Sequence, residues 1–341
     1  MTWTVRVLDP RTDPEPAGWA AFLRAQQAPL TWDYGLLRTE SERSRSPDLL
    51  TVVTEGDTLV GAVLAMLCGP GRWRGPARWG PRWLEVRHAW APCHPAWLFA
   101  EELDAAACRE ILRRFERAVC RFTGPGCLGV VYRGIAPDVV GLVSGRGRQV
   151  REVQPDLVLE NTFTELDDWL ASLSRKRRSS LRGQLRKIAA DPGVVVRTGP
   201  ARDDLDPAEL AAMLRAHREA KGPLKFDPRG PVTAAYLGEL VRRPDVVTTT
   251  YHDDRGRLLA FTNLLDHPVM PLQQHWAARP LAEGRPKHLY FGIIAGGVRH
   301  MIEHNRKFLS LGGGVVPLKE SLGFTPSPLR GVVVPRPVTR W

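Results

Sequence analysis

A stretch near the end of the chain, His300-Met301-Ile302-Glu303-His304, has the H-x-x-E-H spacing by which some helices hold zinc. Two histidines four residues apart share one helical face, and the glutamate between them could activate a metal-bound water. Such a site needs a third ligand, and Glu320 is the only carboxylate side chain among the 37 residues that follow His304. We therefore expect two exposed histidines near a helix C-terminus, and no metal site.

The second stretch with chemical potential is 171–190, which holds seven basic residues and no acidic one. Leu181, Leu185 and Ile188 follow the spacing of one helical face, and the cations form a second stripe. Guanidinium groups in such a stripe suit phosphate backbones, where they fix position without reading bases. A solvated helix face, a phosphorylated substrate and an anionic membrane surface are the alternatives. We assign to the stripe the residues Arg175, Lys176, Arg178, Arg182, Arg186 and Lys187.

The charge of the chain is uneven. The whole sequence of 341 residues has a formal net charge of +11, of which residues 161–341 supply +10 (28 basic against 18 acidic residues). A concentrated positive charge attracts polyanions. No run approaches the roughly 20 apolar residues of a membrane span, and the first residues lack a secretory signal, so we expect a cytoplasmic protein.

Motifs for common cofactors are absent from the sequence. It contains no G-x-S-x-G, no Walker loop and no G-x-G-x-x-G, so we expect no bound cofactor. Five scattered cysteines without a C-x-x-C pair indicate reduced thiols. The loop from Gly69 to Trp83 interleaves arginines with tryptophans, which could stack bases or a sugar, or plug the end of a sheet.

The order of the expected elements repeats along the chain. A hairpin, a connection, a long helix and a short strand occur first at 50–67, 101–122 and 128–132, and again at 246–265, 287–305 and 308–311. This pattern predicts an α/β (α+β) protein with mixed sheets flanked by helices. We expect two similar domains, 1–160 and 161–341, the second beginning with the basic helix at about 171–190.

Three features resemble the FemAB-like branch of the GNAT acyltransferase superfamily. They are the basic helix between Ser172 and Lys187, the helix 290–305 followed by a strand and three glycines, and the segment Lys319-x-x-Leu322-Gly323-Phe324. The resemblance covers most of the chain, although the first 150 residues match only in architecture. It implies tandem GNAT-like domains.

The resemblance also implies an activity: transfer of an aminoacyl group from an aminoacyl-tRNA to an amine or hydroxyl. The small acceptor would be a peptidoglycan precursor or a natural-product intermediate. The concentrated positive charge agrees with binding of tRNA, which is a polyanion. The pyrophosphate-binding pattern of CoA-using relatives, Q/R-x-x-G-x-G/A, has only a poor counterpart at 279–286. An acyltransferase that uses acyl-CoA or an acyl carrier is therefore the first alternative, and a non-catalytic nucleic-acid-binding protein is the second.

Lys319 matches the lysine of the family in this segment, which implies a role in stabilising the oxyanion of the reaction. The alternative is a surface lysine before a short helix. His275 is a candidate base, or else a hydrogen-bonded core histidine. Strand alternation predicts that Gln273 and His275 point to one face of the sheet, and that Gln274 and Trp276 point to the other. As substrate-binding residues we name Asn263, Gln274, Trp276, Tyr290 and Arg299.

Overall fold

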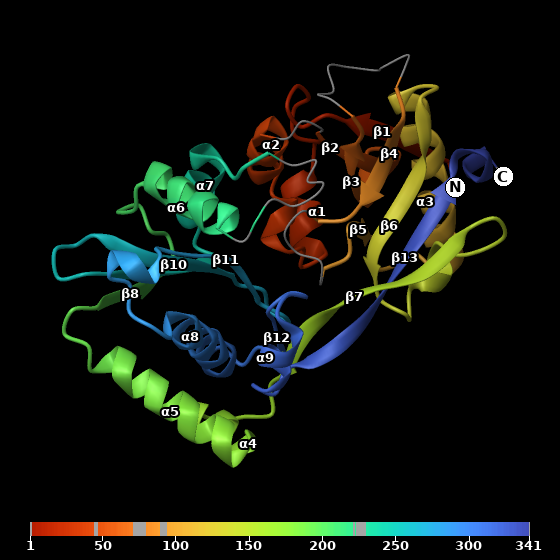
Figure 1. The fold of residues 1–341 in the computed structure, drawn as a ribbon. Helices are drawn as coiled ribbons and strands as arrows, with labels where there is room; N and C mark the ends of the chain where they lie inside the picture. Colours follow the sequence, from red (N-terminus) through yellow and green to blue (C-terminus); the bar gives the residue numbers. More distant parts are fainter. Residues whose placement is uncertain are drawn as a thin grey trace. The chain divides into compact units, whose positions relative to one another are not determined.

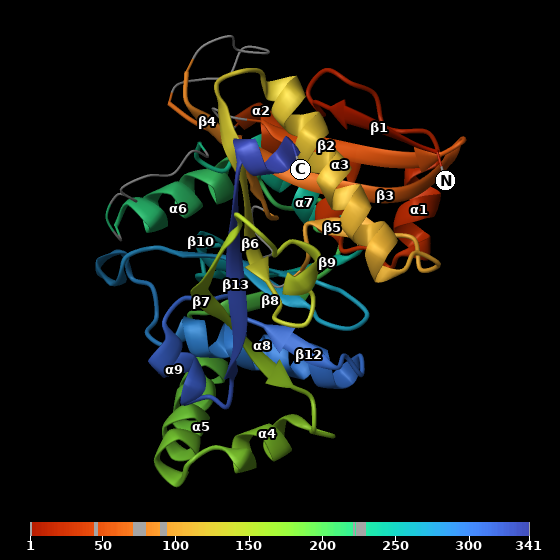
Figure 2. The same cartoon turned by 90° about the vertical axis from the view of Figure 1, so that its right-hand side faces the viewer.

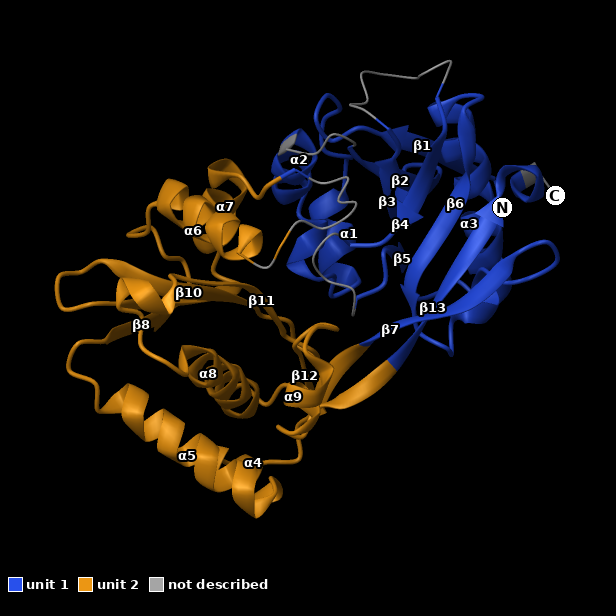
Figure 3. Cartoon of the chain, in the orientation of Figure 1, with its two compact units in different colours: residues 1–155, 226–230, 328–341 blue, residues 156–225, 231–327 orange. Residues whose placement is uncertain are grey.

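The computed structural model describes residues 2–43, 47–70, 80–88, 94–220, 222 and 230–340. The chain folds into two compact units: unit 1 comprises Met1–Pro155, Phe226–Gly230 and Pro328–Trp341, and unit 2 comprises Asp156–Lys225 and Pro231–Ser327 (Figure 3). The predicted domain boundary at residues 160 and 161 stays a prediction; the compact units differ from it in placing 328–341 in unit 1. Most of the loop rich in arginine and tryptophan, residues 71–79, lies outside the described residues.

Unit 1 is a mixed sheet with a long helix, α3. Its strands follow the order β1-β2-β3-β4-β6-β13, with β5 on β3. Asp104 begins α3 by accepting a hydrogen bond from the backbone of Ala107 (2.7 Å), and Gly124 ends it at a φ of 93°. The elements are β1 (Trp3–Leu8), α1 (Trp19–Ala25), η1 (Leu30–Trp32), α2 (Tyr34–Arg43), β2 (Asp48–Glu55), β3 (Thr58–Cys68), β4 (Arg82–Val86), β5 (Trp97–Phe99), α3 (Ala105–Thr123), β6 (Cys127–Ile135), η2 (Val140–Leu142), β13 (Thr325–Pro335) and η4 (Arg336–Arg340).

The strands of unit 2 follow the order β7-β12-β11-β10-β9-β8. Helices α6 and α7 cover one face, and α8 covers the other, with α4 and α5 packed against α8 (Figures 1 and 2). The elements are β7 (Gln149–Glu160, which begins in unit 1), α4 (Leu166–Ser172), α5 (Arg175–Ala189), β8 (Val195–Gly199), α6 (Pro207–Glu219), α7 (Ala234–Val241), β9 (Val246–His252), β10 (Leu258–Leu265), β11 (Leu272–Ala278), η3 (Leu281–Glu283), α8 (Leu289–Glu303), β12 (Phe308–Ser310) and α9 (Val316–Glu320).

The repeated order of elements is confirmed. In unit 1 the hairpin β2–β3 leads through β4 and α3 to β6, which is parallel to β4. In unit 2 the hairpin β9–β10 leads through β11 and α8 to β12, which is parallel to β11. The strand that closes each series is antiparallel: β13 pairs with β6, and β7 pairs with β12. Both units are therefore built on one α/β plan.

The basic stretch forms a helix that is shorter than the predicted 171–190. Helix α4 ends at Ser172, and a new helix, α5, begins at Arg175. Ser174 caps α5 by accepting a hydrogen bond from the backbone of Arg177 (3.4 Å). Leu181, which is 1% exposed, anchors α5 in the core beneath α8. Across the described part of the chain, none of the helices combines the length and the apolar character that crossing a membrane requires.

Candidate functional site

The outer face of α5 carries a row of cationic side chains. Arg175, Lys176, Arg186 and Lys187 are exposed, and within the described part of the chain no ion pair engages them. The other two members of the predicted stripe have partners. Both are local contacts: Arg178 donates to the carbonyl of Ala171 (2.8 Å), and Arg182 pairs with the exposed Asp167 at 3.3 Å. The uncompensated charge is therefore held on one regular helix.

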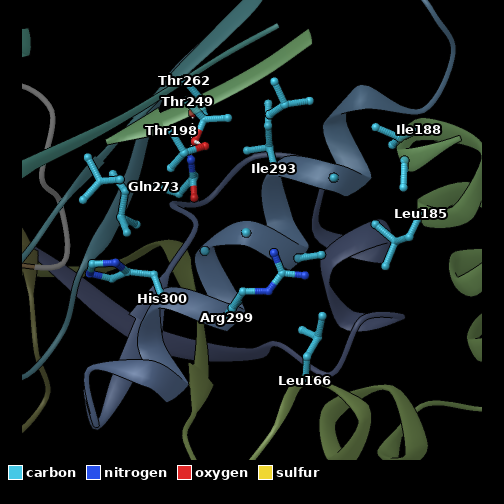
Figure 4. A pocket seen from close by; sticks show the side chains of 18 of the residues that line it. Leu166, Leu185, Ile188, Thr198, Thr249, Thr262, Gln273, Ile293, Arg299 and His300 are labelled. Carbon is cyan, nitrogen blue, oxygen red and sulfur yellow. Dashed lines mark hydrogen bonds between the residues drawn. The ribbon is translucent and has the colours of Figure 1, made fainter. Parts of the chain in front are cut away.

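A cavity of about 830 Å³ lies beneath α5, between the sheet of unit 2 and α8 (Figure 4). Most of its wall is aliphatic, and the hydroxyls of Thr198, Thr249 and Thr262 lie together on the strand side. Thr198 and Thr249 hydrogen-bond to each other at 3.0 Å. The aliphatic wall consists of Leu166, Leu170, Leu185, Ile188, Val196, Val247, Leu264 and Ile293.

The cavity stays unfilled on the side of α8 because the residues of α8 that face it are small. Gly292, Ala295, Gly296 and Gly297 all line the cavity. A Cβ at Gly297 would lie 2.7 Å from Oε1 of Gln273, the end of a flexible side chain that would have to move to make room for it. A Cβ at Gly296 would meet nothing within 4 Å. The small residues thus have two separate effects, close helix packing and an unfilled chamber.

The charged residues of the cavity are mostly cationic. Arg182 and Arg186 enter from α5, and Arg299 enters from α8, where its guanidinium is exposed. Glu303 is the acid that lines the cavity. His300 also lines it, but its Nε2 lies 3.0 Å from Asp266 Oδ1.

The carboxyl of Asp266 is held strongly in its charged form. Burial alone would raise its pKa, but hydrogen bonds from His300 and Arg306 outweigh burial and lower the pKa well below its usual range. The ring of His304 stacks on that of His300, with centroids 4.1 Å apart. Among the described residues, no group of three histidine, cysteine or acidic side chains is placed to hold a metal ion. In the H-x-x-E-H stretch, His300 therefore contacts Asp266, and His304 contacts His300 within the same helix.

Lys319 lies in a buried polar cluster at the end of β12. Its side chain is 2% exposed, and Nζ donates to the carbonyls of Leu311 (2.5 Å) and Gly312 (2.8 Å), the two residues that follow the strand. Ser310 donates to Asp156 at 2.7 Å in the same cluster. Burial lowers the pKa of Lys319 to about 8, although the nearby Asp156 opposes this shift. The alternative interpretation of Lys319 as a surface lysine is wrong, because its side chain is buried.

The strands β11 and β12 are parallel and share a single registered pair, Leu272↔Ser310. β12 ends at Ser310, the residue of this pair, whereas β11 continues to Ala278, and we call the place where β11 runs on without β12 the opening. Lys319 binds the two residues that follow β12. Two residues near this opening have a left-handed backbone, His275 in β11 (φ 47°) and Val315 before α9 (φ 54°). Such conformations cost about 1–3 kcal/mol in non-glycine residues and cluster at functional sites. We therefore treat the opening as the candidate reaction centre.

The predicted alternation along β11 is wrong at His275. The register of β10 and β11 shifts between Phe261 and Asn263: His275 and Trp276 of β11 together lie opposite Thr262, which marks a β-bulge in β11 at His275. Gln273 lines the cavity on the α8 side, whereas the His275 ring contacts Tyr236 of α7 at 5.9 Å. A left-handed residue in a strand interrupts the alternation of side chains between the two faces of the sheet. Hydrophobic periodicity alone does not show where such a residue lies.

The substrate-binding residues predicted on the strands divide between the two faces of the sheet. Asn263 pairs with Gln274 on the face opposite the cavity, and its amide donates to Thr248 (2.9 Å). Trp276 instead packs at 5.9 Å against Tyr290, at the start of α8.

Arg299 is the member of the predicted substrate-binding set that lines the cavity. Sequence reasoning missed Asp156, Ser310 and the threonines of the cavity wall. No local pattern marked the threonines of the cavity, because Thr198, Thr249 and Thr262 lie on three different strands, β8, β9 and β10.

No family model matches the sequence, and no curated protein is similar to it. Solved structures are similar in fold. FemX matches with a TM-score of 0.62 at 11% identity, over 100% of this chain and 99% of FemX. L-PGS from Bacillus licheniformis matches with a TM-score of 0.61 at 11% identity, over 94% of this chain and 91% of that one. A conserved protein of unknown function from Bacteroides thetaiotaomicron gives 0.57 at 11% identity, over 96% and 99%. The FemAB-like, GNAT-like fold is confirmed.

Proposed function

We propose that this protein is an aminoacyltransferase that moves an aminoacyl group from an aminoacyl-tRNA to an amine or hydroxyl of a small acceptor. The observation that carries the proposal is the row of exposed, unpaired cations on α5, in a fold similar to that of FemX. The alternatives of a solvated face and of an acyl-CoA donor do not require this row. Phosphates of the tRNA acceptor stem would bind Arg175, Lys176, Arg178, Arg182, Arg186 and Lys187.

The chemistry needs no covalent enzyme intermediate, because the ester of an aminoacyl-tRNA is already activated. The acceptor nitrogen or oxygen attacks the ester carbonyl, a tetrahedral oxyanion forms, and the terminal ribose hydroxyl of the tRNA leaves with a proton. The enzyme aligns the two substrates and stabilises the oxyanion. His275, fixed at the bulge of β11, is our candidate for accepting the proton of the acceptor.

Lys319 is our candidate for stabilising the oxyanion. An ammonium group has three N–H donors, and the carbonyls of Leu311 and Gly312 occupy two of them. The third donor is left for the substrate at the opening between β11 and β12. The two carbonyls thereby orient the side chain in advance, which is the condition for efficient electrostatic catalysis. Acceptor contacts at Asn263, Gln274, Trp276 and Tyr290 stay predictions.

The test is transfer of radiolabel from a pool of charged tRNAs to small molecules of a cell lysate. We expect RNase-sensitive transfer by the native protein and a loss of roughly 10²–10³-fold in turnover for Lys319→Met, which keeps the bulk of the side chain without its charge. Lys307→Met is the matched control, because Lys307 is exposed and its ammonium contacts only the ring of Phe308 among the interactions seen for it (5.1 Å).

Two outcomes would contradict the proposal. If Lys319→Met, folded as judged by its thermal transition, turned over like Lys307→Met, the role of Lys319 would be wrong. If no charged tRNA served as donor while CoA raised the melting temperature, the donor would be an acyl-CoA and α5 a solvated face.

A further inference from the structure

The cavity beneath α5 is separate from the chemistry proposed at Lys319, which does not line it. Its wall is built from aliphatic side chains of three strands and three helices, together with small residues of α8. A wall of this composition binds the apolar body of a ligand by removing it from water. Its volume of about 830 Å³ falls in the range of small-molecule sites, which is about 300–1,000 Å³.

The cations of the cavity point to the other half of the ligand. Three arginines, Arg182, Arg186 and Arg299, line it against one acid, Glu303. Arg182 has a partner in Asp167, whereas no ion pair is seen for Arg186 or Arg299 within the described residues. Guanidinium groups bind carboxylates and phosphates through two parallel hydrogen bonds, so an anionic head group is what this set recognises.

We propose that this cavity is a binding site for an amphipathic anion, a ligand with an acyl-chain body and a carboxylate or phosphate head. The chain lies between the aliphatic wall and the small residues of α8, and the head lies at Arg186 and Arg299. The hydroxyls of the threonines on the strand side already have hydrogen-bond partners. Thr198 bonds with Thr249, and Thr262 accepts a hydrogen bond from Gln273 at 2.7 Å. An apolar neighbour on the strand side therefore leaves these hydroxyls partnered, whereas the buried Oε1 of Gln273 has no hydrogen-bond partner seen among the described residues.

This inference goes beyond the proposed transferase and does not depend on it. Arg175, Lys176 and Lys187 belong to the proposed tRNA surface and do not line the cavity, whereas Gly296 and Arg299 line the cavity and lie on α8. Variants of these two sets therefore distinguish loss of the anion site from loss of tRNA binding.

The first experiment fills the cavity. Dodecanoate and dodecyl phosphate are titrated into the full chain by calorimetry, together with dodecanol, which has the same chain without a charge. We expect at least one anion to bind tenfold or more tightly than dodecanol, and we expect Gly296→Leu to abolish that binding. Gly183→Leu is the matched control: Gly183 is a helical glycine of α5 outside the cavity, and a Cβ there also meets nothing within 4 Å.

The second experiment removes one cation. Arg299→Gln should weaken binding of the anion about tenfold and leave dodecanol unchanged. Arg215→Gln on α6, an exposed arginine outside the cavity, should change neither. Stronger binding of the phosphate would assign the head group to phosphate esters, and stronger binding of dodecanoate would assign it to free acids.

Three results would overturn the inference. One is equal affinity for dodecanol and both anions, which would leave the arginines without a role in recognition. Another is undiminished binding to folded Gly296→Leu, which would place the ligand elsewhere. The third is tight binding of adenosine monophosphate in the same cavity with no binding of either chain, which would make it a nucleotide site.

Discussion

The two units share one order of elements but differ at the parallel strand pair that their long helices connect. In unit 1, β4 and β6 are joined along their length by four registered pairs, from Arg82↔Cys127 to Val86↔Tyr132. In unit 2, β11 and β12 share the single pair Leu272↔Ser310. The same connection therefore gives a parallel strand pair that is joined by four residue pairs in unit 1 and by one residue pair in unit 2.

The connecting helices differ in the same sense. Helix α3 of unit 1 presents Ile111, Leu112, Phe115 and Val119 to its sheet, all at most 1% exposed. Helix α8 of unit 2 also buries Ile294, Val298 and Met301, but it presents Ala295 and three glycines to the cavity. Large side chains stabilise unit 1 by burying apolar area, whereas the small ones in unit 2 give up that stabilisation and leave room for a ligand. Both proposed sites, the reaction centre at Lys319 and the cavity beneath α5, belong to unit 2.

The largest effect that we expect concerns the packed helix of unit 1. Phe115→Ala should lower the free energy of unfolding by about 3–5 kcal/mol, because it removes a fully buried ring and leaves a cavity. Urea unfolding followed by circular dichroism measures the change, and Phe115→Leu should cost clearly less. A cost below about 1 kcal/mol for Phe115→Ala would show that the packing of α3 is not what distinguishes the units.

The next effect concerns the open strand pair of unit 2. The pKa of Lys319 is lowered to about 8, so its ammonium is fully present well below pH 8 and is lost above it. If the ammonium stabilises the oxyanion, single-turnover rates should be constant at low pH and fall about tenfold per unit above pH 8. A rate that instead rises through pH 8 would indicate that neutral Lys319 acts as a base.

A third comparison sets the cations of α5 against those of α3. Arg175→Gln with Lys176→Gln should weaken tRNA binding and reduce the slope of log affinity against log salt by about 1.5, because two phosphate contacts are lost. Arg109→Gln with Arg113→Gln removes two exposed arginines of α3 as the matched control. Filter binding at several salt concentrations measures both, and equal slopes for the two double variants would argue against an α5-specific tRNA surface.

The smallest effect concerns the stability of the cavity helix. Gly296→Leu should leave the free energy of unfolding unchanged or raise it by about 0.5–1 kcal/mol, because leucine favours the helix and a Cβ there meets nothing. Chemical unfolding measures the difference. A loss of more than about 1 kcal/mol would mean that the space beside α8 is not available for a side chain or a ligand.

Much of the fold could be predicted from the sequence, because hydrophobic periodicity and turn signals are local. The long helix 287–305 is observed as Leu289–Glu303, and the hairpin around His252 is observed as β9 and β10. The basic stripe was predicted because charge spacing on a helix depends only on 3.6 residues per turn. The helix that carries it begins at Arg175 and not at about 171, because α4 ends at Ser172 and Ser174 caps α5.

The candidate site was less predictable, because its residues meet only through pairing and packing. Lys319 was singled out in the sequence, but Asp156 and Ser310, which hydrogen-bond to each other in the same cluster, lie more than 150 residues apart and were not. His275 was assigned to the same face as Gln273, and one left-handed residue made that assignment wrong. A bulge changes the face of a side chain without changing the sequence period on either side of it.

The sequence by itself determined the α/β plan, its repetition and the placement of positive charge on one helix, because each is carried by neighbours along the chain. Only the tertiary structure decided that the last strand closes unit 1, that β11 and β12 share one residue pair, and that three glycines of α8 open a cavity beneath α5. These features depend on contacts between residues far apart in the chain, whose energies local pattern does not encode.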